Sequence, residues 1–510
     1  MVNLSSFIRF HALRQPDKLA LIYRGERVTY AEFDARIARA AAILAADGIG
    51  PGDIVAVFMK NSAAFLEIAF AASHLGAVFL PVNFRLSGEE CAYIVGHAGA
   101  KRLYADAEFA PIVAGIDGAV LVGEAAQGDF GRLTAAELPP APLHARKPAD
   151  LFRLMYTSGT TDRPKGVMHS YENFYWKCMD HVIALPLTAD DTLLAVGPLY
   201  HVGAFDLPGI AILWVGGTLV VHRQFDEAET LAAIQAERIT CAWFAPMMVG
   251  RLLAFEGAGR YDLSSFKWCI AGGEKTPEDR IRAFSTLFTA GRLIDGFGLT
   301  ETCSGDTLME AGKEIEKIGS TGRALAHVEV SIRDDAGVAL PAGVEGEICL
   351  SGPKVTKGYW RDPEKTAASF HGDRFRSGDI GYLDADGFLF VTDRKKDMII
   401  SGGENIASSE IERVIYQMPD VAECTVVGMP DAKWGERPAA IVVVRPGGSL
   451  SAGDVEARCR AALASFKVPS RVLFREALPR NPSGKVLKRV LRDELKDLVA
   501  KEWVDKENGR

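Results

Sequence analysis

Strand-like and helix-like segments alternate along residues 28–104 of this chain. Residues 30–47 repeat Ala, Leu and Ile at helical spacing behind a capping Thr29, and residues 54–59 form a short apolar run typical of a buried strand. The rhythm continues with a helix, a strand and a helix over residues 63–75, 77–82 and 88–97. Strands that alternate with helices pack as a parallel sheet covered by helices, so the sequence predicts an α/β fold.

The alternation of helices and strands continues after residue 170 and gives way to other patterns from residue 318 onward. Residues 171–185 predict a helix capped by Ser170, and residues 192–196 predict the strand after it. Over residues 318–395, alternating apolar positions and turn signals that contain Asp and Gly predict a small antiparallel β-subdomain. From residue 397 onward, short helical and strand-like segments predict a compact α+β domain.

Length and composition limit the classes of protein that remain. A chain of 510 residues is too long for one hydrophobic core, and its net charge of -8 gives no general attraction to nucleic acid. Residues 1–18 are charged and lack a long apolar run, so we expect no secretory signal. The most apolar segment, residues 207–221, is broken by Pro and Gly, so we expect no integral membrane segment. Eight dispersed cysteines without a Cys-x-x-Cys pair indicate neither disulfides nor zinc and fit the cytoplasm.

A loop rich in Ser, Thr and Gly follows the apolar run over residues 151–156. Residues 156–167 read Tyr-Thr-Ser-Gly-Thr-Thr-Asp-Arg-Pro-Lys-Gly-Val. Such residues let a backbone turn its N–H groups into one concavity that binds phosphate oxygens, and Lys165 adds a mobile positive charge. An ordinary turn between two strands is the alternative interpretation. A P-loop is excluded, because Pro164 stands where its second glycine belongs.

This stretch resembles the signature loop of the adenylate-forming enzymes, which include acyl-CoA synthetases, luciferases and peptide-synthetase adenylation domains. Ten of the eleven fixed positions of the family form match, and Asp162 stands where the family has glycine. The resemblance implies that ATP phosphates are bound by this loop, through Thr157, Ser158, Gly159, Thr160, Thr161 and Lys165.

Residues 199–203, Leu-Tyr-His-Val-Gly, resemble the second motif of the family, in which an aromatic–His pair lies beside the acyl site. His201 is thereby implied to gate that site, whereas a lone histidine would otherwise be a satisfied core or surface residue. The implied acyl pocket consists of His201, Val202, Gly203, Phe205, Trp243 and Gly272. Residues 202–221 and 240–250 contain no arginine that could neutralise a second carboxylate, so we expect short dicarboxylates to be poor substrates.

Two further stretches resemble the nucleotide-binding motifs. Residues 271–277 occupy the place of a loop along the adenine and acyl groups, which implies contacts from Gly273 and Glu274; a surface ion pair between Glu274 and Lys275 is the alternative. Residues 295–301, Asp-Gly-Phe-Gly-Leu-Thr-Glu, resemble the aromatic-Gly-x-Thr-Glu motif. That match implies adenine contacts from Asp295, Gly296 and Phe297, an α-phosphate contact from Thr300, and Mg²⁺ ligation by the hard oxygen of Glu301.

The C-terminal motifs also match in order. The resemblance implies that Asp379 and Arg394 hold the ribose, that Lys396 is the hinge of a mobile small domain, and that Gly402 and Gly403 admit the pantetheine arm. Residues 479–485, Pro-Arg-Asn-Pro-Ser-Gly-Lys, resemble the terminal motif, whose lysine, here Lys485, catalyses adenylation. Eight basic residues between 467 and 492 form either a solvated face or a docking surface for CoA or ATP phosphates.

Taken over nearly the whole chain, the resemblance implies an ATP-dependent acid–CoA ligase that forms an acyl-adenylate and then a thioester. Catalysis is assigned to Lys485, Glu301, Thr300 and His201. We predict an adenylation domain over residues 1–395 and a mobile domain over residues 396–510. The expected partners are ATP, CoA, Mg²⁺ and an apolar monocarboxylic acid, either a medium- or long-chain fatty acid or an aromatic acid such as a hydroxycinnamate or benzoate. A homodimer is left open, as are carrier-protein loading, luciferase-type oxygenation and a non-catalytic nucleotide sensor.

Overall fold

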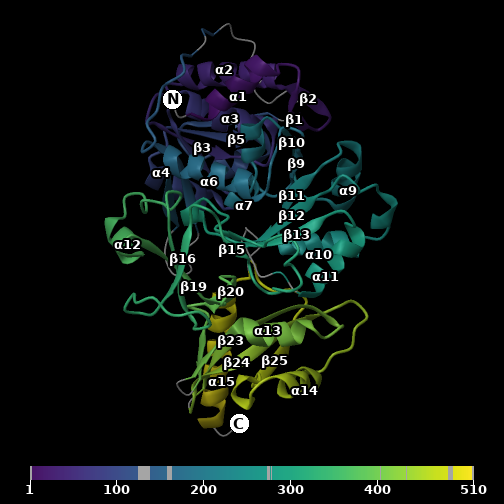
Figure 1. Cartoon of the computed structure of the whole chain (residues 1–510). Coiled ribbons are helices and arrows are strands. Elements are labelled where there is room, and N and C mark those ends of the chain that lie inside the picture. Colours follow the sequence, from purple (N-terminus) through teal and green to yellow (C-terminus); the bar gives the residue numbers. More distant parts are fainter. Residues whose placement is uncertain are drawn as a thin grey trace. The chain divides into compact units, whose positions relative to one another are not determined.

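The computed structural model describes residues 3–123, 138–139, 141–157, 164–272, 276, 278–401, 404–431, 433–480 and 486–507. The chain divides into two compact units (Figure 1). Unit 1 consists of Met1–Val330 and Leu350–Phe375, and unit 2 consists of Ser331–Cys349 and Arg376–Arg510. The domain boundary predicted after residue 395 stays a prediction.

Unit 1 contains two largely parallel sheets among its described residues. The first has nine strands, in the spatial order β15 (Arg323–Ala324), β14 (Thr307–Leu308), β13 (Arg292–Phe297), β12 (Trp268–Gly272), β11 (Cys241–Phe244), β9 (Thr192–Ala195), β10 (Thr218–Val221), β1 (Leu19–Tyr23) and β2 (Glu26–Thr29). The second has six strands, in the order β6 (Ala119–Val122), β5 (Arg102–Asp106), β3 (Ile54–Phe58), β4 (Val78–Pro81), β7 (Leu151–Thr157) and β8 (Lys165–Ser170). The predicted α/β class is confirmed.

Helices connect and cover these sheets. They are α1 (Leu4–Arg14), α2 (Tyr30–Ala46), α3 (Ala63–His74), α4 (Gly88–Ala98), α5 (Ala110–Val113), α6 (Tyr171–Ala184), α7 (Val202–Asp206), α8 (Ala211–Val215), α9 (Glu227–Ala236), α10 (Pro246–Ala254) and α11 (Glu278–Leu287). A further helix, α12 (Pro363–Ala368), lies later in the chain, between two strands of the antiparallel sheet described next. The predicted caps are confirmed: Thr29 and Glu32 form a reciprocal capping box, and so do Ser170 and Asn173. One core buries side chains of α9, α10 and α11 against the nine-stranded sheet.

A five-stranded antiparallel sheet corresponds to the predicted β-subdomain. Its order is β16 (Glu329–Arg333), β17 (Gly346–Ser351), β19 (Arg374–Leu383) and β18 (Phe370–His371), with β20 (Leu389–Arg394) also paired to β19. The boundary between the two units runs through the strands of this sheet.

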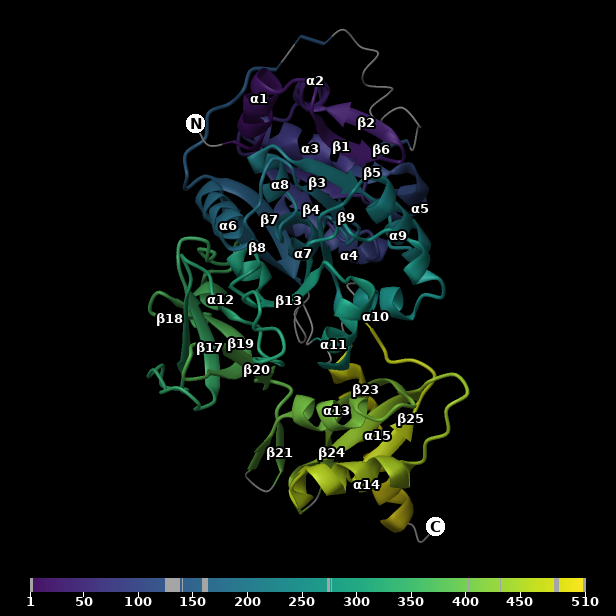
Figure 2. The same cartoon turned by 45° about the vertical axis from the view of Figure 1, so that its right-hand side comes forward.

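The C-terminal part of unit 2 is a sheet with helices on both faces (Figure 2). Its strands are β22 (Glu404–Ile406), β21 (Ile399–Ser401), β24 (Gly435–Val444) and β23 (Val421–Asp431), with β25 (Arg471–Phe474) paired to β24. Helices α13 (Ser408–Tyr416) and α14 (Ala452–Ala462) pack on one face, and α15 (Lys488–Glu507) packs on the other through Leu491 and Leu495. The predicted α+β character of this region is confirmed.

All eight cysteines are buried and free, in agreement with the expected absence of a disulfide framework. Within the described part of the chain, none of the helices combines the length and the apolar character needed to cross a bilayer.

Candidate active site

The phosphate-loop candidate lies at the end of an antiparallel hairpin. Strands β7 and β8 pair so that Thr157 stands opposite Lys165. The Thr157 hydroxyl oxygen is buried, and no described residue provides a hydrogen-bond partner for it. A phosphate oxygen would satisfy this hydroxyl. The predicted loop residues between the strands, Ser158, Gly159, Thr160 and Thr161, lie outside the described residues, as does Asp162.

Lys165 and Glu301 are brought together by a residue that sequence analysis did not find. The Lys165 ammonium donates to the Tyr359 hydroxyl at 2.7 Å, and that hydroxyl donates to Glu301 Oε1 at 2.8 Å. Lys165 Nζ also lies 3.6 Å from the Glu301 carboxylate and 4.1 Å from the centre of the Tyr359 ring. Tyr359 belongs to no motif recognised in the sequence, and it lies 58 residues from Glu301 along the chain.

Burial sets the protonation states of this group. It raises the pKa of the Tyr359 phenol well above its usual value, and the charge of Glu301 adds to the rise. Burial also lowers the pKa of Lys165, with Glu301 acting in the opposite direction. Tyr359 therefore stays a neutral hydrogen-bond donor between the Lys165 amino group and the Glu301 carboxylate.

The turn that carries Thr300 and Glu301 is a short 3-10 helix, Thr300–Thr302, which follows β13. The Glu301 carbonyl accepts from the Thr356 amide at 2.7 Å, and the Thr302 hydroxyl donates to the Asp306 carboxylate. Glu301 is almost fully buried. Within the described residues, no cluster of three or more His, Cys, Asp or Glu side chains could hold a metal ion. A single carboxylate is what Mg²⁺ needs when phosphate oxygens and water supply its other ligands, so Glu301 fits that role.

The adenine candidates lie where two neighbouring parallel strands end. Gly272 at the end of β12 pairs with Gly296 in β13, and Asp295 pairs with Ala271. A Cβ atom on Gly272 would lie 3.1 Å from the Gly296 carbonyl oxygen, so the backbones approach closely here. Phe297 is the last residue of β13 and is buried. Gly273, Glu274 and Lys275 lie outside the described residues.

On the acyl side, His201 begins α7 and accepts a hydrogen bond from the Gly203 amide through Nδ1. Its ring lies 6.4 Å from the Trp243 ring. The indole of Trp243 lies so close to the backbone that a Cβ atom on Gly203 or Gly197 would come within 2.5 Å of it. The structure therefore groups His201, Gly203 and Trp243, and their place in the acyl site stays a prediction.

Two further acyl-site candidates are buried. Phe205 is fully buried and packs against Phe79 and Phe174, while its ring also lies beneath the guanidinium of Arg153. Val202 is buried in the first turn of α7. Phe205 thus packs among aromatic residues of the core, and its place in the acyl site stays a prediction.

The ribose candidates and the hinge candidate lie in unit 2. Asp379 in β19 stands opposite Arg394 in β20, and their side chains form an ion pair at 3.2 Å. Lys396 follows two residues later, and burial lowers the pKa of its ammonium. Gly402, Gly403 and Lys485 lie outside the described residues.

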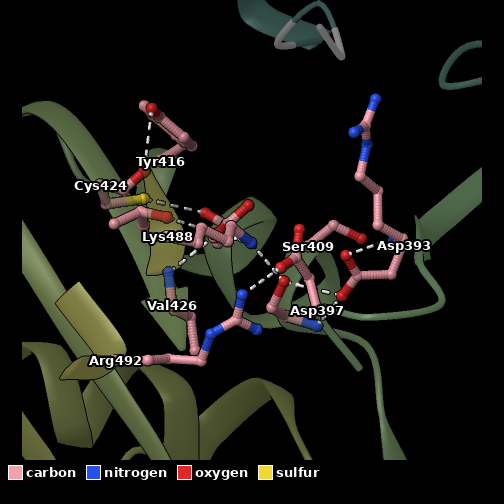
Figure 3. Close-up of polar contacts among 12 residues, drawn as sticks. Asp393, Asp397, Ser409, Tyr416, Cys424, Val426, Lys488 and Arg492 are labelled. Atoms are coloured by element: carbon pink, nitrogen blue, oxygen red, sulfur yellow. Dashed lines mark hydrogen bonds and ion pairs between the residues drawn. The ribbon is translucent and has the colours of Figure 1, made fainter. Parts of the chain in front are cut away.

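Hydrogen bonds and an ion pair connect the segment around Lys396 to α15 (Figure 3). Arg492 donates to the Lys396 carbonyl at 2.9 Å and to the Asp397 carboxylate at 2.8 Å. Lys488 pairs with Glu412 at 2.8 Å. Burial acts to lower the pKa of Lys488, but Glu412 and Asp393 outweigh it, and the pKa is raised.

Many of the basic residues predicted as a cluster are engaged within unit 2. Five of them form ion pairs with carboxylates: Lys467, Arg475, Arg480, Lys488 and Arg492. These pairs leave less of the positive charge available to the phosphates of a ligand.

Two models of known enzyme domains match long segments of this chain. The AMP-binding enzyme family model matches residues 8–360, and the AMP-binding enzyme C-terminal domain matches residues 410–485. A feruloyl-CoA synthase from Amycolatopsis sp is 38% identical over 96% of this chain and 98% of its own. The long-chain-fatty-acid–CoA ligase FadD13 of Mycobacterium tuberculosis is 36% identical over 98% of this chain and 100% of its own.

Solved structures are similar over the same extent. ATP-bound MatB from Rhodopseudomonas palustris has a TM-score of 0.91 and 33% identity, covering 97% of this chain and 99% of that one. The o-succinylbenzoate CoA synthetase of Bacillus subtilis, solved with its acyl-adenylate intermediate, has a TM-score of 0.87 and 32% identity, covering 96% and 98%.

The chain therefore belongs to the AMP-binding enzyme family, the adenylate-forming enzymes. Within that family it is an acid–CoA ligase, which uses ATP to form an acyl-adenylate and then passes the acyl group to CoA. The predicted family, fold and activity are confirmed.

Proposed function

We propose that this ligase activates an apolar monocarboxylic acid, and that an aromatic acid fits it best. The observation that carries the proposal is the position of Trp243, whose indole packs against the backbone of Gly203 and Gly197, with its ring centre 6.4 Å from that of His201. A flat aromatic wall favours an aromatic ring over a flexible chain, because offset stacking adds stabilisation and an aromatic acid loses little conformational freedom. The feruloyl-CoA synthase, a relative, is named for an aromatic acid.

The proposed adenylation site assigns a task to each residue. Bound Mg²⁺, held by Glu301, would neutralise charge on the ATP phosphates. Thr157, Lys165 and Thr300 would bind phosphate oxygens. The Tyr359 hydroxyl links Lys165 to Glu301 through two hydrogen bonds and so keeps the two side chains close together. Asp379 and Arg394 would bind the ribose, so their mutual ion pair would be exchanged for contacts with its hydroxyls. Lys485 would stabilise the charge that develops as the carboxylate attacks the α-phosphorus.

The thioester step is proposed to use a second arrangement of the same chain. Residues 396–510 would rotate about Lys396, so that Lys485 leaves and the backbone at Gly402 and Gly403 admits the pantetheine arm. The CoA thiol would then attack the acyl carbon, and AMP would leave.

A dicarboxylic acid is the second candidate, because the structure shows a positive charge that the sequence did not reveal. Tyr200, next to His201, is buried, and its hydroxyl has no hydrogen-bond partner among the described residues. Burial raises the pKa of this phenol to about 12, and the charge of Arg85 acts against that rise. The Arg85 guanidinium lies over the Phe84 ring, which packs edge-on against Tyr200, so Arg85 is the residue that would recognise a second carboxylate.

A panel of acids separates the two candidates. Wild-type protein is mixed with ATP, Mg²⁺ and CoA, and pyrophosphate release is measured with ferulate, benzoate, indoleacetate, hexanoate, dodecanoate and malonate. We expect the highest kcat/KM with one of the aromatic acids, and we expect Arg85→Leu to leave it within about threefold. Efficient turnover of malonate that disappears in Arg85→Leu would establish the dicarboxylic acid instead.

Location and assembly are separate proposals. We place the enzyme in the cytoplasm, where eight free cysteines remain reduced. A homodimer remains to be tested by sedimentation of the purified protein across a hundredfold range of concentration.

A further inference from the structure

Behind the Thr300–Thr302 turn lies a cluster of charged side chains that the proposed chemistry does not use. The side chains of Arg153 in β7, Lys177 in α6 and Asp206 in α7 have no exposed surface. The Arg153 guanidinium donates to both oxygens of Asp206, at 3.2 and 2.7 Å, and the Lys177 ammonium lies 3.4 Å from the same carboxylate. Two buried cations thus share one buried anion.

This cluster reaches the turn through His169, a fully buried residue of β8. Arg153 Nε donates to His169 Nδ1 at 3.1 Å, so Nδ1 is the acceptor nitrogen of the ring. The proton is therefore on Nε2, which lies 2.6 Å from the Thr300 carbonyl oxygen and donates to it. Burial, together with the charge of Arg153, lowers the pKa of His169 to about 3, so the ring keeps this neutral form at working pH.

The arrangement is a costly way to gain stability. Charges removed from water lose hydration that their mutual attraction recovers only in part, and apolar side chains of the same volume would serve the core as well or better. The cluster does, however, determine which nitrogen of His169 faces the turn. It also includes Asp206, the last residue of the helix that His201 begins, so the acyl-side helix and the Thr300 turn share one set of contacts.

We propose that His169 is a positioning residue for adenylation. Its Nε2–H holds the Thr300 carbonyl, and this contact aims the Thr300 hydroxyl and the Glu301 carboxylate at the phosphates and the metal ion. Arg153, itself held by Asp206, fixes the tautomer of the ring. The inference rests on the proposed roles of Thr300 and Glu301.

Two polar substitutions separate positioning from packing. In His169→Gln the side-chain amide can still reach the Thr300 carbonyl as a donor. In His169→Asn the shorter amide can still accept from Arg153 but does not reach Thr300. The matched control is His74→Asn, because His74 is also buried, with Nδ1 facing the Ser5 hydroxyl and Nε2 facing the Ala141 carbonyl oxygen.

Three measurements are made on each folded protein. They are the Kd of Mg·ATP by calorimetry, ATP–pyrophosphate exchange with the best acid, and thioester formation from supplied acyl-AMP and CoA. We expect His169→Asn to weaken Mg·ATP binding and exchange by about 10- to 100-fold, the range seen when the partner that orients a functional ligand is lost. We expect His169→Gln and His74→Asn to stay within about threefold of wild type, and thioester formation to stay within about threefold in all of them. His169→Met, which lacks both hydrogen bonds, should behave like His169→Asn.

Equal behaviour of the Asn and Gln variants would overturn the inference, and so would a loss in His169→Asn that is as large for thioester formation as for exchange. Either result leaves the proposed function standing, because wild-type protein would still bind Mg·ATP and exchange pyrophosphate. A wild-type protein that fails to bind Mg·ATP would overturn the proposed phosphate site and this inference with it.

Discussion

The cluster of Arg153, Lys177 and Asp206 in unit 1 is buried more deeply than the ion pairs around the proposed hinge in unit 2. Arg153 and Asp206 have no exposed side-chain surface, whereas the side chains of Arg394 and Arg492 are 41% and 26% exposed. Breaking a buried pair leaves an uncompensated charge in the core, whereas an exposed pair can exchange its partner for water at little cost. We therefore expect the cluster in unit 1 to stay in place, and the ion pairs in unit 2 to be remade during the proposed rotation.

The largest expected effect tests whether the two half-reactions depend on different parts of the chain. Lys485→Ala should lower acyl-AMP formation by at least about 100-fold, because a charge that stabilises the transition state is lost. Thioester formation from supplied acyl-AMP should persist. The control is Lys496→Ala, at an exposed residue of α15, and it should change neither rate. Equal loss of both half-reactions in Lys485→Ala would argue against a two-state mechanism.

Substitution at the hinge should produce the opposite pattern. Lys396→Pro fixes φ and should block the rotation, so thioester formation should fall by about tenfold or more while ATP–pyrophosphate exchange persists. Stopped-flow measurement of each half-reaction checks this, after circular dichroism has shown that the variant is folded. Unchanged thioester formation would place the pivot elsewhere in the chain.

The stability of the two charge networks can be compared directly. Asp206→Ala leaves the buried cations Arg153 and Lys177 without their carboxylate partner. It should therefore lower the free energy of unfolding by about 3–5 kcal/mol. Asp397→Ala breaks the pair with Arg492 and should lower it by less than about 1 kcal/mol. Urea unfolding, with hydrogen exchange followed in peptides of each unit, gives both values. Similar losses would remove the contrast between the units.

His169 should make the stability of unit 1 depend on pH. Its pKa in the folded protein is about 3, below the ordinary value of 6.5. Between these two pH values the ring is protonated in the unfolded chain but neutral in the folded protein. The free energy of unfolding should therefore fall as the pH drops from about 6.5 towards 3. In His169→Gln this part of the decline should disappear, which urea titrations at pH 7.5, 6 and 5 would show. An unchanged slope would mean that His169 is protonated in the folded protein.

The smallest expected effect concerns the departure from the family motif. We predict that the Asp162 side chain points away from the phosphates, so Asp162→Gly should leave the KM for ATP within about threefold, measured by pyrophosphate release. A much lower KM in the variant would show that the native carboxylate opposes ATP binding.

Local rules let the sequence determine the elements and much of the candidate site. The capping box of Thr29 and Glu32 involves residues three positions apart, and helix α2 begins where that pattern predicts. The pairing of Thr157 with Lys165 is equally local, because one hairpin connects them. The family could be identified from the sequence because each of its motifs is a short continuous segment, and the motifs follow one another in the family order.

Only the tertiary structure decided which distant side chains meet. Tyr359 joins Lys165 to Glu301, and His169 joins Arg153 to Thr300, across separations that no helical or strand period spans. Phe205 is a second example, because its packing against Phe79 and Phe174 joins segments that are far apart in the sequence. Periodicity reports which residues are buried, whereas contacts between distant segments depend on how the sheets and helices pack together.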